Sequence, residues 1–327
     1  MLGGGFGRRL WADFVTDAIQ VSRKSKKPVK LMWTREDDMG HDFFRPTSIH
    51  KLSATLSNRD ELTSWTHRII APSISGQRAP ERFKDGELDR SAVNGASNIP
   101  YEISNVLVDY IMTNTKVPVG WWRSVYNSQN AFANEGFIDE LSQKAGIDPY
   151  QFRLNLLKNA PRHLGVLKLA AEKANWGKKM AKRQGMGIAL HESFGSWAAH
   201  VAKVTVTKTG ELSIDKIVAA VDCGLVVNPD GVKAQMESSI VYGLTSTLKG
   251  LITIEKGAVA QSNFHEFELL RIDEMPKVEV YIVKSAEPPG GAGEPGLPPV
   301  APAVTNAIFA ATGKRIRSLP IRPKDLI

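Results

Sequence analysis

The chain has 327 residues, of which 42% are hydrophobic and 23% are charged, so it can bury a sizeable core and is not disordered. Its single cysteine, Cys223, excludes an internal disulfide, a four-cysteine iron–sulfur cluster and a cysteine-rich zinc site. The formal net charge of +8 favours anionic partners, but the basic runs lack interleaved aromatic residues and do not predict nucleic-acid binding. No apolar run is long enough to predict a membrane span.

The first third of the chain is predicted to contain one helix, one strand and one hairpin. Apolar residues at helical spacing predict a helix over residues 9–24, and Pro28 prevents its continuation. The apolar segment 29–34 predicts a strand. Alternating apolar residues predict a hairpin of residues 48–56 and 62–70, followed by a polar loop over residues 73–98.

Three helices are predicted before a linker. The first covers residues 128–145, with Phe132, Phe137, Leu141 and Ala145 as its core face. The second begins with Asp148 as N-cap, Pro149 at the first position and Gln151 closing a capping box, and Pro161 ends it. The third covers residues 164–175, and the basic segment 177–185 is the predicted linker.

The second half is richer in strands. The predicted strands are 200–208, 212–221, 251–254 and 277–283, and the predicted helices are 235–248 and 301–312, with a Pro/Gly loop over 287–299 between the last two elements. Strands mixed with helices and hairpins predict an α+β fold. We expect two mixed domains, residues 1–175 and 186–327, with a cleft between them that holds Phe6, Arg123 and Glu294.

Three motifs point to chemistry. Gly3-Gly4-Gly5-Phe6-Gly7 precedes a predicted helix, where glycine backbone N–H groups and the helix N-terminus suit an anion, although a tight structural turn explains the motif equally well. It lacks the third glycine of a dinucleotide fingerprint, because Arg8 stands at that position. The missing third glycine argues against an intact small oxidoreductase that binds a dinucleotide through this motif.

The other two motifs contain an arginine and a glutamate. Arg123 follows Trp121 and Trp122, and stacking could hold its guanidinium as a rigid donor fork, but a surface arginine over two packed rings is the commoner arrangement. Glu294 lies in Gly293-Glu294-Pro295, where a stiff loop suits a positioned general base, although such loops are usually inert. The His-Glu pairs lack companion ligands at metal spacing, so no metal ligand is predicted.

Taken in order, the motifs resemble one family. The chain resembles the large, molybdenum-cofactor-binding subunit of the xanthine dehydrogenase/aldehyde oxidase superfamily of molybdenum hydroxylases, and more closely the bacterial isoquinoline 1-oxidoreductase beta-subunit type. The resemblance rests on the three motifs above and on the segments 28–39, 221–229, 235–237 and 291–302. It covers nearly the whole chain.

The resemblance implies a cofactor and roles for individual residues. The cofactor is a molybdenum–molybdopterin cytosine dinucleotide, and Glu294 is the catalytic base. The residues implied to contact the cofactor are Gly4, Gly5, Phe6, Gly7, Arg123 and Gln235. The implied reaction hydroxylates an electron-poor carbon with oxygen from water, and a small partner subunit with [2Fe–2S] clusters receives the electrons.

Two departures from the family pattern narrow the expectation. Purine-oxidising members carry a glutamate shortly after the glycine motif, where this chain has Arg9-Leu10, which favours an N-heteroaromatic or aldehyde substrate. The family's Met-Gly-Gln-Gly cofactor loop is absent. We therefore expect the chain to be the C-terminal portion of a bacterial subunit, inactive alone and in need of a missing N-terminal cofactor-binding region, in the periplasm or the cytoplasm. The alternative is an inactive fragment that serves as a folded interaction module.

Overall fold

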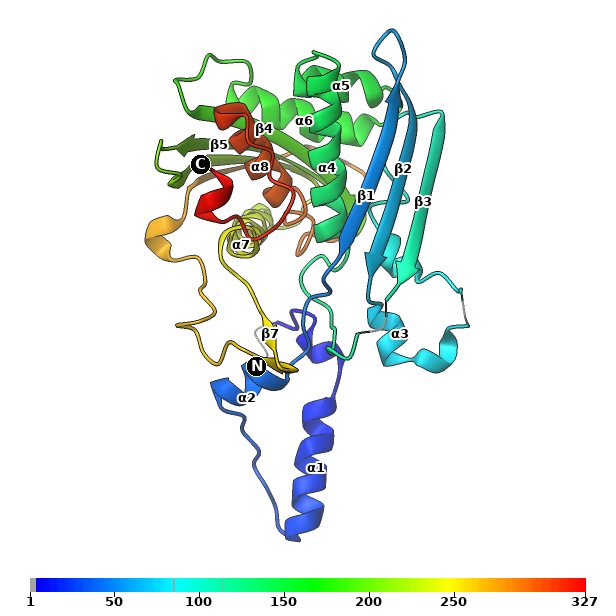
Figure 1. The fold of residues 1–327 in the computed structure, drawn as a ribbon, viewed down its shortest axis with the longest axis vertical. Coiled ribbons are helices and arrows are strands. Elements are labelled where there is room, and N and C mark those ends of the chain that lie inside the picture. Colours follow the sequence, from blue (N-terminus) through cyan, green and yellow to red (C-terminus); the bar gives the residue numbers. More distant parts are fainter. Residues whose placement is uncertain (1–3, 85, 114) are drawn as a thin grey trace.

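The computed structural model describes residues 4–84, 86–113 and 115–327, and it confirms the predicted α+β class. Gly3, the first residue of the predicted glycine motif, lies outside the described residues. Two sheets form the body of the molecule, and a helical arm extends from it (Figure 1). One sheet contains β1 (Ile49–Leu56), β2 (Leu62–Ala71) and β3 (Asn105–Met112), and the other contains β4 (Gln184–Ser193), β5 (Ser196–Val206), β6 (Leu212–Asp222) and β9 (Lys277–Ile282).

The three-stranded sheet is built on the predicted hairpin, which the structure confirms. β1 and β2 pair antiparallel, and β3 joins the other edge of β2 in parallel. The sequence prediction missed β3, and it assigned a plain loop where the short helix α3 (Ile74–Arg78) forms. Trp65 of β2 is buried against Phe137 and lies in one apolar cluster with Ile138 and Leu141. This contact attaches the sheet to the long helix α4 (Asn127–Lys144).

The four-stranded sheet is the most deeply buried part of the fold. β4, β5 and β6 form an antiparallel meander, and β9 adds in parallel to β6. Buried residues on one sheet face pack with α6 (Pro161–Ala174), and those on the other face pack with α7 (Pro229–Leu248) and α8 (Val300–Thr312). A Cβ at Gly187 would lie 2.1 Å from the backbone nitrogen of Ala307, so β4 needs glycine for α8 to approach this closely.

Helix α4 forms as predicted, and of its predicted core face Leu141 is buried while Phe137 and Ala145 pack against the same cluster, but the helix also buries polar residues that were not predicted. Phe132 and Phe137 are only partly buried, whereas Asn134, Glu135 and Asp139 are buried. A buried charged side chain is strongly unfavourable unless it is paired with an opposite charge. Arg153 of α5 (Pro149–Leu156) donates to the Glu135 carboxylate at 3.0 Å, and this pair is almost fully excluded from solvent. The helix therefore buries a polar face because partners on neighbouring elements satisfy it.

The helix starts were partly predicted. Asp148 caps α5 by accepting from the backbone N–H groups of Tyr150 and Gln151, with Pro149 at the first position, as predicted. The capping box is wrong, because the Gln151 side chain donates to Asn155 instead. Pro161 is the first residue of α6, which begins three residues earlier than predicted. Other short elements include the helix α2 (Arg35–His41) and the paired strands β7 (Ile254–Glu255) and β8 (Ala258–Val259).

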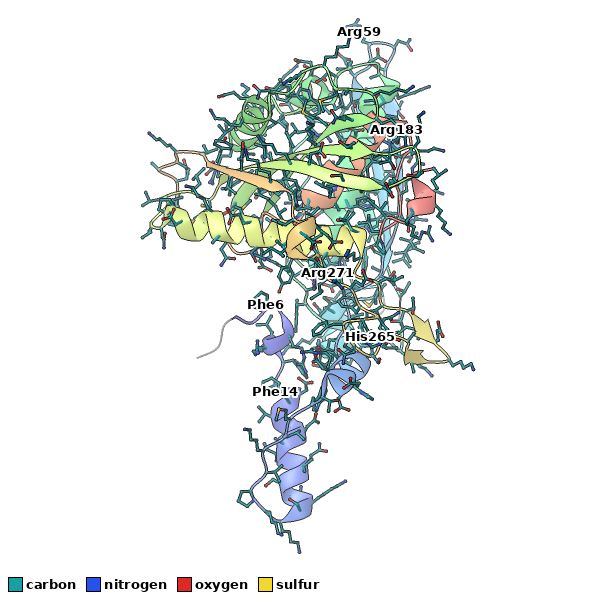
Figure 2. The ribbon with its side chains drawn as sticks, turned by 90° about the vertical axis from the view of Figure 1, so that its left-hand side faces the viewer. Phe6, Phe14, Arg59, Arg183, His265 and Arg271 are labelled. Carbon is teal, nitrogen blue, oxygen red and sulfur yellow. The ribbon has the colours of Figure 1, made fainter. Side chains whose placement is uncertain are left out.

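The arm consists of α1 (Asp13–Ser25) and the extended segment that returns beside it, and it points away from both sheets (Figures 1 and 2). None of the 13 residues of α1 is buried in the described structure, although Phe14, Val15 and Ile19 are apolar. The strand predicted over 29–34 is wrong, because this segment pairs with no strand in the part of the chain that the structure describes. An open groove of about 1050 Å³ lies between α1 and this segment.

The boundary between the expected domains, 1–175 and 186–327, stays a prediction. One apolar cluster joins α4, α5 and α6 to residues of β4 and β5, so buried contacts cross the predicted boundary. The predicted linker 177–185 runs into β4, which begins at Gln184. Within the described residues, no helix is both long and apolar enough to cross a lipid bilayer.

Candidate active site

Arg123 lies at the centre of the candidate site and joins three segments. It is 6% exposed and sits in the turn that precedes α4. Its Nε donates to the Gly293 carbonyl at 2.8 Å, its Nη1 donates to Ser238 Oγ at 2.8 Å, and its Nη2 donates to Gln235 Oε1 at 3.0 Å. The guanidinium fork therefore binds protein acceptors, and it fixes the Glu294 loop against α7.

Glu294 is held next to Arg123 by Ser124. The Ser124 backbone N–H donates to Glu294 Oε1 at 2.9 Å, and Ser124 Oγ donates to the Glu294 carbonyl at 2.7 Å. The carboxyl group is half-buried, and within the described residues Oε2 receives no hydrogen bond. One carboxylate oxygen is thus fixed in position, and the other remains able to accept a proton.

The turn that presents Ser124 is strained. Ser124 has φ of 70° and Val125 has φ of 48°, in the left-handed region that side chains with a Cβ rarely adopt. A β-branched residue such as Val125 is a clear outlier there. Such backbone strain is commonly found at functional sites, where the surrounding contacts hold it in place. Here it directs the Ser124 N–H group at the Glu294 carboxylate.

Tyr242 connects the glycine motif to the arginine turn. Its ring stacks on Phe6 with centroids 5.8 Å apart, and the Arg123 guanidinium lies 5.2 Å from its centre. Sequence reasoning missed both Tyr242 and Ser238. Ser238 lies three residues and Tyr242 seven residues after Gln235, which places all three on one face of a helix, and this signal was present in the predicted helix 235–248.

The glycine motif borders the site without touching Glu294 in the described contacts. A Cβ at Gly7, which has φ of 84°, would lie 2.1 Å from the Trp121 carbonyl oxygen, so only glycine permits this approach. The carbonyls of Gly4 and Gly5 accept from the Arg9 side chain and the Arg9 backbone N–H. Phe6 is 53% exposed and lies between the arm and the body of the molecule (Figure 2).

Burial sets the electrostatics of the site. It lowers the pKa of Arg123, and the nearby Glu294 carboxylate opposes this shift without cancelling it. The geometry thus brings together Arg123, Gln235 and Glu294, with Phe6 linked to them through Tyr242. A rigid carboxylate with one open oxygen beside a buried cation suits proton acceptance at a reacting group.

Comparisons with known proteins identify the fold. A family model described as a molybdopterin cofactor-binding domain matches residues 1–157, and a second of the same description matches residues 168–276. The quinoline 2-oxidoreductase structure from Pseudomonas putida 86 superimposes with a TM-score of 0.81 over 99% of this chain and 67% of that chain. At 12% identity, this likeness shows a shared fold.

Two curated relatives match along the whole chain. The isoquinoline 1-oxidoreductase subunit beta of Brevundimonas diminuta is 32% identical over 329 residues, which cover 99% of this chain and 42% of that protein. The membrane-bound aldehyde dehydrogenase (pyrroloquinoline-quinone) of Gluconacetobacter polyoxogenes is 35% identical over 356 residues, which cover 100% and 46%. The chain spans less than half the length of these relatives.

Proposed function

This chain belongs to the family of large, molybdopterin-binding subunits of molybdenum hydroxylases, and on that premise we propose that it supplies the base-bearing part of a catalytic centre. The enzyme hydroxylates an N-heteroaromatic or aldehyde carbon. The observation that supports this proposal most directly is the fixed Glu294 carboxylate, held by Ser124 beside Arg123.

The residues present fit one side of a pterin cofactor. Gln235 accepts from Arg123 through Oε1, which leaves its exposed amide nitrogen as a donor. The Nε2 atom of Gln129 is buried without a partner among the described residues, close in sequence to the Arg123 turn. Polar heteroaromatic rings take such neutral donors. We propose that Gln235, together with the backbone of Gly4, Gly5, Phe6 and Gly7, contacts a molybdopterin cytosine dinucleotide, and that Arg123 orients Gln235.

We propose a division of chemistry between the cofactor and the residues of this chain. When bound, the molybdenum cofactor supplies the redox centre and activates water-derived oxygen for transfer. Glu294 accepts, through Oε2, the proton that the water-derived oxygen loses. The Ser124 N–H meanwhile holds Oε1 in place. Arg123 keeps the loop of Glu294 rigid by donating to the Gly293 carbonyl. A small [2Fe–2S] subunit takes up the electrons.

The chain alone is a poor catalyst in this proposal. A dinucleotide cofactor needs more donors than this chain offers, so the region that the longer relatives carry in addition completes the site. A folded module without cofactor is the competing function. Metal analysis of the chain co-expressed with that region separates the two, because about one molybdenum per complex supports the enzyme and none supports the module.

The decisive test replaces Glu294 in the complete enzyme. Glu294→Gln keeps the size of the side chain but removes its charge and its proton-accepting power. We expect molybdenum content to stay unchanged while turnover falls by about 10²-fold or more. Single-turnover reduction of the enzyme by substrate and metal analysis measure the two effects separately.

The matched control is Glu287→Gln, because Glu287 is an exposed residue of the same loop. This variant is expected to keep the turnover rate within a few-fold of that of the parent enzyme. Full single-turnover activity in Glu294→Gln would refute the assignment of this residue as the base. Loss of molybdenum together with activity would show that Glu294 shapes the cofactor site instead.

A further inference from the structure

The arm carries an apolar face that no described residue covers. The groove between α1 and the returning segment, which we call the arm groove, is bordered on its helix side by Phe14, Val15 and Ile19, among other residues. These three side chains are 45%, 46% and 60% exposed, and Figure 2 shows Phe14 on the arm, away from both sheets. Contiguous apolar surface of this kind marks an interaction site.

The other wall of the arm groove has the side-chain alternation of a β-strand. Val29, Leu31 and Trp33 border the groove, whereas the intervening Lys30 and Met32 do not. Within the described residues, the backbone groups of residues 29–33 make no hydrogen bond with another backbone group. An extended segment with free N–H and C=O groups is a template for pairing with another strand. The arm thus supplies a helix and one strand of a layer, and the neighbouring strand is not among the described residues.

The size of the arm groove points to a polypeptide as its occupant. Its volume of about 1050 Å³ equals that of roughly 35 molecules of liquid water at about 30 Å³ each. Release of water from an apolar wall favours association. A single aromatic ring needs only about 150 Å³, so one small molecule would leave most of the open groove unfilled. Several side chains of a docking strand would fill it.

The charge of the arm narrows the kind of partner. Residues 18–34 contain five cationic side chains and no acidic one, and the cations are Arg23, Lys24, Lys26, Lys27 and Lys30. Two copies of this segment paired side by side would repel each other, which disfavours a second copy of the chain. The cations instead suit a partner that carries acidic side chains beside its apolar strand.

A lipid surface fits the arm less well than a protein does. Anionic lipid would attract the same cations, and the apolar face of α1 would enter the interface. However, lipid offers no hydrogen-bond partner to the free backbone groups of residues 29–33. A protein strand satisfies the backbone, the apolar wall and the charge together.

The curated relatives indicate which polypeptide is available. The chain covers only 42% and 46% of the two relatives that match along its whole length, so those proteins carry a large additional region. The arm also lies next to the glycine motif, because Arg8 and Arg9 border the arm groove and the Arg9 side chain donates to the Gly4 carbonyl at 2.7 Å. A region docked on the arm is therefore adjacent to the proposed cofactor contacts.

We propose that the arm groove is the docking site for the region that the longer relatives carry in addition. A β-strand of that region pairs with residues 29–33, its apolar side chains pack on α1, and its acidic side chains face the cations of residues 23–30. The identity of the partner rests on the proposed function, whereas the evidence for the docking surface does not.

Thiol labelling tests whether the arm is covered. Ile19→Cys and Leu31→Cys are labelled with a maleimide in the 327-residue chain and in the complete enzyme, where the native Cys223 is a buried background. We expect labelling in the complete enzyme to be slower by about ten-fold or more at both positions. Arg59→Cys, in the exposed hairpin turn, is the control and should react equally fast in both proteins. Equal rates at Ile19→Cys and Leu31→Cys in the two proteins would overturn the proposal.

Hydrogen exchange tests the strand pairing separately. In the 327-residue chain the amides of residues 29–33 should exchange fast, because they have no backbone partner among the described residues. In the complete enzyme we expect every second amide of this segment to be protected, since a strand directs alternate N–H groups to each edge. Exchange that is equally fast in both proteins would overturn the pairing of residues 29–33.

A matched pair of variants assigns docking to the groove side of α1. Ile19→Glu places a charge in the groove, whereas Val21→Glu makes the same kind of change at an exposed residue of α1 that does not border it. The additional region is co-expressed with each variant as a separate polypeptide. We expect Ile19→Glu to lower the amount that co-purifies by about ten-fold or more, and Val21→Glu to leave it unchanged.

The melting temperature of the 327-residue chain serves as the folding control. It should stay the same in both variants, because α1 has no buried residue in the described structure. Equal co-purification with Ile19→Glu and Val21→Glu would overturn the assignment of the groove as the docking site.

The remaining outcomes separate the docking surface from other occupants and from the proposed function. Sedimentation of the complete enzyme with phosphatidylglycerol vesicles that Ile19→Glu abolishes would identify a lipid surface and overturn the proposal. Protection of Ile19→Cys that disappears on dilution would identify a second copy and also overturn it. A protected arm in a complete protein without molybdenum would uphold the docking site and refute the proposed function, and an active enzyme with an unprotected arm would do the reverse.

Discussion

At the scale of single residues, Arg123 shows why a planar donor fork is needed. Its hydrogen bonds reach Gly293, 170 residues away in sequence, and two residues of α7. Lysine keeps the charge but offers one ammonium group in place of the fork. We expect Arg123→Lys to lower the free energy of unfolding by about 1–3 kcal/mol and to reduce molybdenum retention in the complete enzyme.

Chemical denaturation and metal analysis check this expectation. Arg317→Lys, whose side chain is mostly exposed and pairs with Glu140, is a suitable control and should change stability by less than about 1 kcal/mol. Equal stability losses in the two variants would mean that the bonds of Arg123 to Gly293 and α7 add nothing beyond an ordinary surface pair.

At the scale of elements, α4 depends on its buried ion pair. Glu135 also accepts from the Tyr101 hydroxyl and from the Leu190 backbone N–H, so its carboxylate joins α4 to β4 as well as to α5. Glu135→Ala removes the carboxylate that pairs with the buried Arg153, and we expect a loss of about 3–5 kcal/mol in the free energy of unfolding.

A control for this prediction lies further along the same helix. Glu140→Ala removes a pair with the exposed Arg317 and should cost less than about 1 kcal/mol. Urea unfolding of both variants gives the comparison. Similar losses for Glu135→Ala and Glu140→Ala would contradict the view that burial makes the first pair critical.

In contrast to α4, the helix α1 of the arm has no buried residue in the described structure. A helix of 13 residues without tertiary packing is marginal in water. We expect the backbone amides of α1 to exchange with solvent much faster than those of β5, whose residues are mostly buried. Hydrogen exchange followed by mass spectrometry tests this, and protection of α1 equal to that of β5 would show that another surface covers its apolar face.

The same contrast explains what the sequence could predict. The β1–β2 hairpin and α5 were predictable because alternation and the Asp148 cap are local signals. The polar buried face of α4 was not, because Arg153 and Leu190 satisfy Glu135 only in the folded chain. β3 was missed because its residues are mostly exposed or half-buried and show no clear alternation.

The site followed the same rule. The motifs were visible in the sequence and predicted Arg123, Gln235 and Glu294, which the fold brings together. The sequence could not show that Arg123 binds the loop of Glu294 directly, because this contact depends on segments that are distant in sequence.

At the scale of the whole molecule, buried histidines link stability to pH. Burial lowers the pKa of His50 and His163 to about 4 and that of His67, His191 and His200 to about 3, from an ordinary value of 6.5. The unfolded chain then binds more protons than the folded chain between pH 6.5 and these values. Stability is therefore expected to fall as the pH falls from 6.5 towards 4, by up to about 1.4 kcal/mol per pH unit for each histidine.

His200 provides the variant that tests this linkage. Both of its ring nitrogens are buried without a partner among the described residues, so His200→Leu removes no known hydrogen bond. We expect the variant to be as stable as the parent at pH 7 or more so, and less sensitive to acid by up to about 1.4 kcal/mol per pH unit. Urea unfolding between pH 4 and 7 measures the slope, and an unchanged slope would contradict the prediction.

The sequence separation of 170 residues between Arg123 and Gly293 also determines how long after Arg123 its bonding partner is synthesised. At about 5–20 residues per second, a ribosome needs roughly 10–30 s to deliver Gly293 after Arg123 has emerged. During that interval the strained turn at Ser124 and Val125 has no Glu294 carboxylate to hold it. Every nascent chain thus passes through a period in which it contains the strained turn but not the carboxylate that we propose as the base, so premature termination anywhere before Glu294 yields a protein without that carboxylate.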